Sequence, residues 1–259
     1  MKPKALILFT TGTNRDGDVA VAFEQAGAQT KIRPLIDLRT SEQNWQDYQI
    51  LVIPGGFSYA DALGAGKLLA LDLNSYFKDQ IQDFVSAGKP VIGICNGFQA
   101  LVKAGILPGN NLSAGKPQAT LTFNQIGHFE CRWVQLRPSS QTCLWTRDLK
   151  SDINCPVAHG EGNFQVADDQ ILDKLQQSDQ IALTYLNQNG QLANGEYPYN
   201  PNGSCLDIAG ICNPSGNVLG LMPHPEDHIF EFQNPNRLHR KNNSGLALFV
   251  NGVSHATQS

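Results

Sequence analysis

The chain has 259 residues, a formal net charge of −4, 16% charged residues and 24 glycines. This length suits one large domain with a sizeable core, so we expect residues 1–259 to fold as a single domain. The mild acidity, without a block of Lys or Arg, argues against a nucleic-acid surface, and no apolar run approaches the roughly 18 residues of a membrane span.

The first half of the chain alternates strand-like and helix-like patterns. A parallel sheet with right-handed crossovers is expected from such alternation. Its ligands should bind beyond the carboxyl ends of the strands. The expected strands cover 4–9, 30–36 and 48–53, with a helix over 18–25 and a long helical region over 63–86.

The pattern changes from about Ser113 to short runs rich in turn residues, typical of antiparallel strands and hairpins. The turn-rich run GEYPYNPNGS (195–204) is included in this expectation. No linker or repeat separates the two halves, so the second half should extend the same sheet or cover it. We therefore predict an α/β fold with a mainly parallel central sheet flanked by helices, and added antiparallel strands in the second half.

Two late strands are expected over 210–212 and 218–222, joined by a turn at 213–216. A last short helix should cover 244–250, and nothing in the sequence predicts a structure beyond Gly252.

Six cysteines are scattered through the chain, without a Cys-x-x-Cys pair or a Cys/His spacing typical of zinc. The apolar part of the first ten residues is too short for a signal peptide and is better explained as a first strand. These features predict reduced thiols and a cytoplasmic location.

The segment KPVIGICNGFQAL (89–101) carries the most specific chemical signal. An apolar run typical of a buried parallel strand leads into Cys95, and a helix-forming run follows. Gly93 and Gly97 let neighbouring backbone crowd a sharp turn. This pattern is that of a nucleophile elbow with cysteine in place of serine, and a helix N-terminus favours the thiolate. The alternative is that Cys95 is simply a small buried residue.

A cysteine nucleophile needs a base and a group that orients the base. His224 and Glu226 follow an expected strand and lie two residues apart, so in an extended segment their side chains point to the same side. Flanking prolines would stiffen that segment. Taken alone, however, a His-x-Glu beside a strand is more often a surface pair.

Backbone N–H groups complete the predicted site. Gly55 and Gly56 follow a strand that should end near Cys95, and their N–H groups, with that of Asn96, would form an oxyanion hole for a tetrahedral acyl intermediate. The alternative is an ordinary Pro-Gly-Gly turn.

Seven segments follow one another in a characteristic order: PGGFSYAD (54–61), GICNGFQAL (93–101), FECRWV (129–134), HGEGNF (159–164), NPNGS (200–204), IAGICN (208–213) and LMPHPE (221–226). Together they resemble the class I (triad-type) glutamine amidotransferases, and within them the glutaminases of phosphoribosylformylglycinamidine synthase, an enzyme of purine synthesis. A cysteine elbow with His-x-Glu resembles the whole class, whereas Asn-Gly-Phe-Gln after the cysteine, HGEG and NPNGS resemble the purine enzyme.

This resemblance implies a flavodoxin-like fold and a glutaminase reaction through a cysteine thioester. It implies Cys95 as nucleophile, His224 as base and then acid, and Glu226 as the carboxylate that orients it. The substrate-binding residues implied by the resemblance are Gly55, Gly56, Asn96 and Gln99.

The resemblance also implies L-glutamine as substrate and a formylglycinamidine ribonucleotide synthetase subunit as partner. A small third subunit is a further partner that the resemblance allows. The resemblance places ATP and magnesium on the synthetase partner, and the lack of a phosphate-loop motif in this chain agrees with this; no cofactor or metal is expected here. Rival interpretations are a non-catalytic docking subunit of the same fold, the glutaminase of another synthetase, and a thiol stress protein or peptidase.

Three positions depart from the family's usual pattern. Arg15 stands where a cysteine is common, Ala60 stands where a glycine often follows Phe-Ser-Tyr, and Asp227 stands where an arginine often follows His-x-Glu. These departures bear on the partner interface and on the gating of the glutamine site. The sequence does not determine whether the chain is active without the synthetase.

Overall fold

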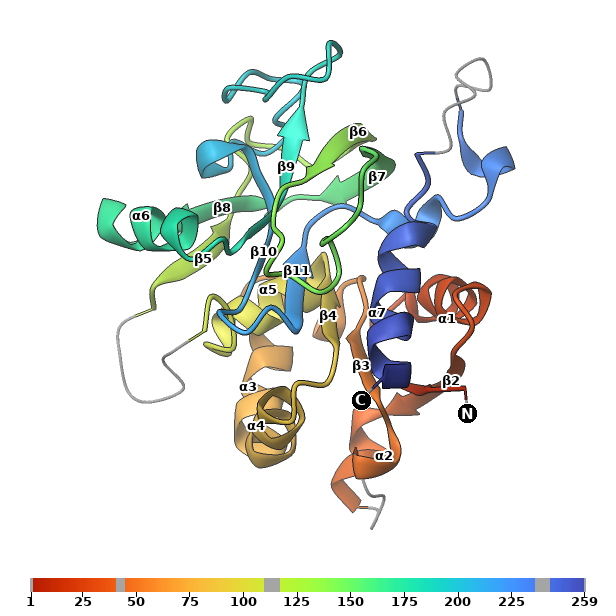
Figure 1. Ribbon diagram of the computed structural model, residues 1–259. Helices are drawn as coiled ribbons and strands as arrows, with labels where there is room; N and C mark the ends of the chain where they lie inside the picture. Colours follow the sequence, from red (N-terminus) through yellow and green to blue (C-terminus); the bar gives the residue numbers. More distant parts are fainter. Residues whose placement is uncertain (1, 41–44, 110–116, 236–242, 259) are drawn as a thin grey trace.

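The computed structural model describes residues 2–40, 45–109, 117–235 and 243–258 (Figure 1). The expected change of pattern at Ser113 lies outside these ranges. In the described part of the chain, strands from both halves form one nine-stranded sheet, and β5 (Ala119–Thr122) pairs with β8 (Asn163–Val166) in a separate two-stranded sheet.

One half of the large sheet is parallel. Its central strands are fully buried, as expected for a parallel sheet covered on both faces. The pairs run parallel from edge to centre through β2 (Gln29–Pro34), β1 (Lys4–Phe9), β3 (Ile50–Ile53), β4 (Val91–Ile94) and β11 (Val218–Leu221).

The second half of the chain continues the same sheet with antiparallel strands. The outermost strand alternates buried and half-buried residues, as expected where one face is less covered. The order continues from β11 through β10 (Ile208–Cys212), β9 (Ile181–Leu186), β6 (Glu130–Pro138) and β7 (Ile153–His159). The predicted α/β class is confirmed.

Helices cover the two faces of the parallel half (Figure 1). On one face, α1 and α7 pack together through Phe23 and Phe249, whose ring centroids lie 5.2 Å apart. The first face carries α1 (Asp16–Gln25) and α7 (Leu246–Gln258), and the other carries α3 (Lys67–Tyr76), α4 (Lys78–Ser86) and α5 (Asn96–Lys103).

Two short helices were not expected from the sequence. The second strand ends at Pro34, and α2 (Leu35–Thr40) follows it. The other, α6 (Asp169–Gln177), begins where the Asp168 side chain accepts a hydrogen bond from the Ile171 N–H at 3.0 Å. Its apolar face is short: Leu175 is buried, and Ile171 and Leu172 are partly buried against the core.

Three further expectations were wrong in detail. The helical region over 63–86 is two helices, because Phe77 leaves the helical conformation and stacks against Trp45 at a centroid distance of 5.4 Å. The last helix is not short, because Gly252 continues it; a Cβ there would lie 2.1 Å from the Trp145 ring. Residues 195–204 form turns without strands.

Among the helices in the described ranges, none is long and apolar enough to cross a membrane.

Candidate active site

Cys95 occupies the turn between β4 and α5. Its φ of 49° and ψ of −105° lie in a region that residues with a side chain rarely adopt, as in a nucleophile elbow. The elbow needs its glycines: a Cβ at Gly97 would lie 1.9 Å from the Ile53 carbonyl oxygen, and one at Gly93 would lie 2.8 Å from the Gly97 oxygen. The elbow predicted from the sequence is therefore present.

The thiol of Cys95 is enclosed by the second half of the chain. The residue is 5% exposed, and Sγ lies 3.7 Å from the carbonyl oxygen of Ala158 at the end of β7. It also precedes α5, whose unpaired N-terminal N–H groups favour negative charge near the thiol.

His224 and Glu226 form a buried hydrogen-bonded pair. The distance from Nδ1 of His224 to Oε1 of Glu226 is 2.7 Å, and the residues are 2% and 1% exposed. The segment is not extended as predicted: Pro225–Asp227 is a 3-10 turn, η4, and this turn brings the two side chains together. Because Glu226 accepts from Nδ1–H, the lone pair of neutral His224 lies on Nε2.

The charges around His224 favour its protonated form. Burial opposes protonation, but the nearby charges of Glu226 and Cys95 outweigh it, so the pKa of His224 is raised well above its ordinary value. The arrangement therefore favours the imidazolium form of His224.

Strand pairing explains how residues 129 positions apart meet, since Leu221 of β11 pairs in parallel with Ile94 of β4. Both strands end at the same edge of the sheet, where Cys95 and His224 follow them. The side chains of Cys95 and His224 both lie close to Gly55. A Cβ at Gly55 would be 2.8 Å from His224 Cε1 and 3.5 Å from Cys95 Cβ.

The predicted oxyanion segment is fixed by the loop after β1. The Asn14 N–H donates to the Gly55 oxygen at 3.4 Å, and the Phe57 N–H donates to the Gly12 oxygen at 2.9 Å. These two bonds flank the bridge between Thr13 and Gly56 and do not use the Gly56 N–H. The two bonds thus hold the segment around Gly56 in place and leave the Gly56 N–H without a partner from this pairing.

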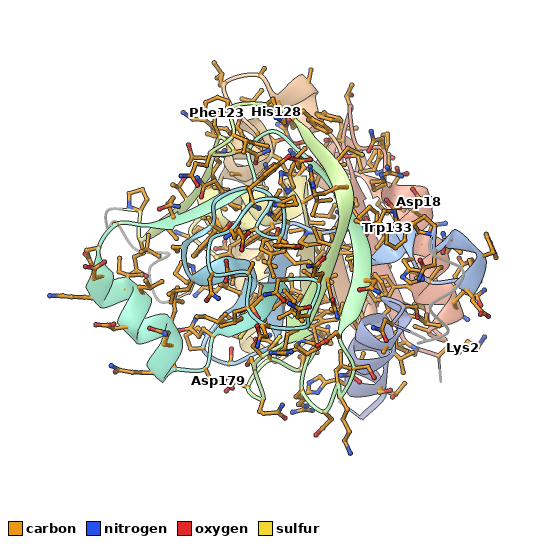
Figure 2. The ribbon with its side chains drawn as sticks, turned by 90° about the horizontal axis from the view of Figure 1, so that it is seen from above. Lys2, Asp18, Phe123, His128, Trp133 and Asp179 are labelled. Carbon is orange, nitrogen blue, oxygen red and sulfur yellow. The ribbon has the colours of Figure 1, made fainter. Side chains whose placement is uncertain are left out.

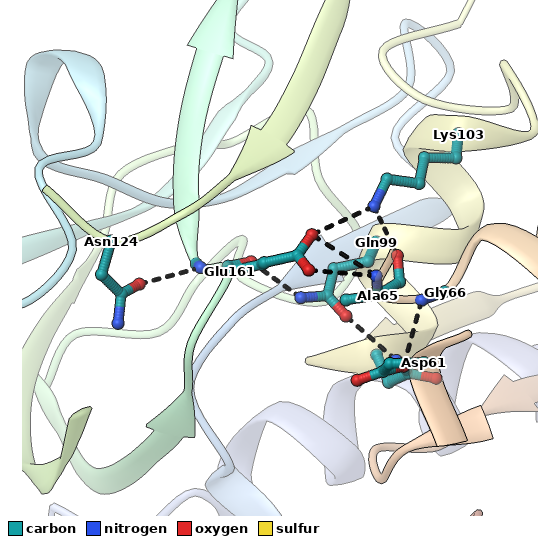
Figure 3. Close-up of polar contacts among 9 residues, drawn as sticks. Asp61, Ala65, Gly66, Gln99, Lys103, Asn124 and Glu161 are labelled. Carbon is teal, nitrogen blue, oxygen red and sulfur yellow. Dashed lines mark hydrogen bonds and ion pairs between the residues drawn. The ribbon is translucent and has the colours of Figure 1, made fainter. Parts of the chain in front are cut away.

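The side chains of Asn96 and Gln99 are engaged within the protein, and Figure 3 shows Gln99 next to Glu161. Asn96 Nδ2 donates to Asp61 Oδ1 at 2.8 Å and to Gln99 Oε1 at 3.1 Å. Gln99 Nε2 in turn donates to the Glu161 carbonyl oxygen at 2.7 Å. The Asn96 side chain is thus occupied within the protein, and the roles of the Asn96 N–H and of Gln99 in substrate binding stay predictions.

Glu161 ties the loop after β7 to the helices on the other side of the elbow (Figure 3). Its carboxylate accepts a hydrogen bond from the Ala65 N–H at 3.2 Å and lies 3.5 Å from Lys103 Nζ. The sequence singled out HGEG as a motif but did not indicate this support.

Asn124 joins the HGEG and NPNGS segments and was missed in the sequence. Its Oδ1 accepts from His159 Nδ1 at 3.1 Å and from the Gly162 N–H at 2.9 Å. Ser204 Oγ donates to the Gly162 oxygen at 3.3 Å. Burial, and then the charge of His224, lower the pKa of His159 to about 3, so this histidine is neutral.

Two of the three departures from the family pattern are in contact. Arg15 Nη1 lies 3.5 Å from Asp227 Oδ1, beside η4. Ala60 lies in a left-handed turn with a φ of 55°. Over the residues that the structure describes, no cluster of three or more His, Cys, Asp or Glu side chains could hold a metal ion.

Comparisons with known proteins find relatives along nearly the whole chain. The family model for the CobB/CobQ-like glutamine amidotransferase domain matches residues 2–256. Phosphoribosylformylglycinamidine synthase subunit PurQ of Treponema denticola is 59% identical over 242 residues, with 88% of this chain and 89% of that protein covered. The PurQ subunit of Dehalococcoides mccartyi is 40% identical over 261 residues, with 99% of each covered.

Solved structures show the same fold. A chain of PurLQS from Thermotoga maritima matches with a TM-score of 0.74 and 30% identity, with 98% of this chain and 99% of that chain covered. A glutamine amidotransferase from the same organism matches with a TM-score of 0.58 at 15% identity over the whole of both chains, which supports the fold alone.

Proposed function

The chain belongs to the family of CobB/CobQ-like glutamine amidotransferases, and we infer that it is the glutaminase subunit of a phosphoribosylformylglycinamidine synthase. The observation that carries the chemistry is the meeting of the elbow thiol of Cys95 with the buried His224–Glu226 pair beside Gly55. The similarity to PurQ subunits supports phosphoribosylformylglycinamidine synthase as the enzyme to which the subunit belongs.

In the first half-reaction, the Cys95 thiolate attacks the side-chain amide carbon of glutamine. The N–H groups of Gly56 and Asn96 stabilise the oxyanion that forms. When the tetrahedral intermediate collapses, the carbon–nitrogen bond breaks and the His224 imidazolium donates a proton to the leaving nitrogen. Ammonia and a γ-glutamyl thioester on Cys95 result.

In the second half-reaction, water attacks the thioester carbonyl while neutral His224 accepts a proton from it through Nε2. The carbon–sulfur bond breaks, glutamate leaves, and the Cys95 thiolate and the protonated His224 of the starting state are restored. Glu226 keeps Nδ1 of the imidazole protonated throughout and so holds its orientation.

Ammonia then passes to the partner synthetase subunit, which converts formylglycinamide ribonucleotide to formylglycinamidine ribonucleotide. We propose that ATP and magnesium bind to that subunit and that the complex works in the cytoplasm. The solved PurLQS complex, which contains a chain similar to this one, supports a partnership with further subunits.

The test is labelling with a glutamine analogue that carries a diazoketone, with and without the synthetase subunit, followed by intact mass spectrometry. We expect a single adduct on Cys95, which is stronger with the synthetase and absent in Cys95→Ala. Cys131 is exposed and Cys95 is buried, so Cys131→Ser, which should label like the wild type, serves as the matched control. The absence of an adduct in both conditions would contradict the proposed chemistry and leave a docking subunit.

A further inference from the structure

Arg15 connects the protein surface to the turn that carries the triad carboxylate. It precedes α1, and its Nη1 lies 3.1 Å from Asp18 Oδ2 and 3.5 Å from Asp227 Oδ1. Asp18 lies on the outer side of α1 (Figure 2), with a side chain 49% exposed, whereas the Asp227 side chain is 18% exposed. The guanidinium therefore reaches inward to η4.

The stem of Arg15 and the imidazole of His224 both border Gly55. The point where a Cβ at Gly55 would stand is 3.5 Å from Arg15 Cγ and 2.8 Å from His224 Cε1. Charges at Arg15 and Asp227 are thus close enough to His224 to act on its protonation through the protein interior.

Asp227 adds a second carboxylate next to Glu226. Burial, and then the charge of Glu226, raise the pKa of Asp227 to about 6, while the charges of His224 and Arg15 act in the opposite direction. Above pH 6 Asp227 is therefore an anion near the base. Arg15 carries the opposite charge at the same place.

We propose that Arg15 and Asp227 are a pair of positioning residues whose opposite charges set how readily His224 gives up its proton. The proposal rests on the proposed function, because His224 must donate a proton to the leaving ammonia and then accept one from water. Asp227 strengthens the hold on the proton, and Arg15 weakens it. Neither residue touches a reacting atom.

The other titratable groups around η4 leave this assignment intact. Burial raises the pKa of Cys155 and lowers that of His159, so both side chains of β7 are neutral near pH 7. His228 turns away to the Trp133 ring, at a centroid distance of 5.2 Å, and His255 of α7 faces Arg147. Among the residues that the structure describes, the other charged groups are Glu226 and Cys95, whose charges act on His224, and Asp16 and Asp18 in the first turn of α1.

The test is a pH titration of the His224 ring in the full chain, monitored by NMR with labelled histidine. The chain has six histidines, and His224→Gln identifies the resonance. Arg15→Met removes the cation and should raise the titration midpoint, whereas Asp227→Asn removes the anion and should lower it, each by about half a pH unit. The pH dependence of Cys95 labelling by the diazoketone analogue should shift in the same two directions.

Two controls separate charge from packing. Arg15→Lys keeps the cation and should return the midpoint close to that of the wild type. Arg137→Met removes an arginine of similar exposure, paired with Asp152 at 3.6 Å away from the triad, and should leave the midpoint unchanged. A purely structural pair would give the same effect in both variants.

Shifts in the same direction, or no shift in either variant, would therefore overturn the proposal. Opposite shifts without any labelling of Cys95 would uphold the charge pair while contradicting the glutaminase chemistry, so the two failures are distinguishable.

Discussion

At the scale of single residues, the elbow depends on the absence of a side chain at Gly97. Because a Cβ there would lie 1.9 Å from the Ile53 oxygen, Gly97→Ala must push α5 away from β3. We expect the free energy of unfolding in urea to fall by about 1–3 kcal/mol. The displaced elbow should also lose labelling by the glutamine analogue.

The matched control for this substitution is Gly17→Ala. Gly17 lies in α1, and a Cβ there would meet nothing within 4 Å, so the variant should be as stable as the wild type or up to about 1 kcal/mol more stable. If Gly97→Ala kept full stability and labelling, the close packing of α5 on β3 would not be what forms the elbow.

Single residues also show where sequence reasoning ended. Gly93 and Gly97 could be identified because the elbow is a local pattern. The contact between Arg15 and Asp227 joins positions 212 residues apart, so no local pattern announces it. Asn124 was missed for the same reason, since an isolated asparagine carries no signal until the pairing of β5 with β8 brings it to His159 and Gly162.

At the scale of elements, the turn η2 (Ser58–Asp61) is strained. Tyr59, Ala60 and Asp61 have φ values of 54°, 55° and 51°. Tyr59 donates to Asp72 through its hydroxyl, and Asp61 accepts from Asn96, so both side chains help to hold the turn. The methyl group of Ala60 forms no hydrogen bond that could offset its conformational cost.

We therefore expect Ala60→Gly to increase the free energy of unfolding by about 0.5–1 kcal/mol in urea denaturation. Ala62, two residues on, has a φ of −55°, so Ala62→Gly should decrease it by a similar amount through chain entropy. A decrease in both variants would show that the left-handed turn is not a source of strain.

Elements with a strong apolar period were predicted from the sequence, and elements with polar surfaces were not. Strand β1 matches its expected bounds, Lys4–Phe9, because every residue between its ends is apolar. The helix α6 was missed although Ile171, Leu172 and Leu175 lie on one face at helical spacing, because this apolar face is short and only the Asp168 cap marks its start. The spacing of apolar residues in the sequence indicates which side of an element is buried, so an element with little buried surface is hard to recognise from it.

At the scale of the whole molecule, the alternation of elements predicted the fold class but not the strand order. The site depends on that order: β11, from the end of the chain, pairs with β4 and places His224 at the elbow. The candidate residues could be identified in the sequence. That they belong to one site was indicated by the resemblance to a family, and the strand order of the structure explains how they meet.

The global response to acid should depend on one buried histidine. The pKa of His159 is lowered from 6.5 to about 3 in the folded chain. Between these pH values His159 is therefore neutral in the folded chain and protonated in the unfolded chain. Its contribution to stability is complete above pH 6.5 and is lost as the pH falls towards 3. Asp227 acts in the opposite sense: its raised pKa, about 6 against 3.8, stabilises the folded chain at low pH, and this contribution is lost as the pH rises through 6.

His159→Gln keeps a side-chain N–H for Asn124 but cannot titrate, so it should flatten the loss of stability in acid. We expect the difference in free energy of unfolding between wild type and variant to change by up to about 1.4 kcal/mol for each pH unit between 6.5 and 4.5, measured by urea denaturation. His128→Gln is the control for the loss of an imidazole, because this side chain is exposed, and its variant should keep the wild-type slope. Equal slopes in all three proteins would mean that His159 takes up its proton without unfolding the chain, and that its buried contact with Asn124 opens in acid.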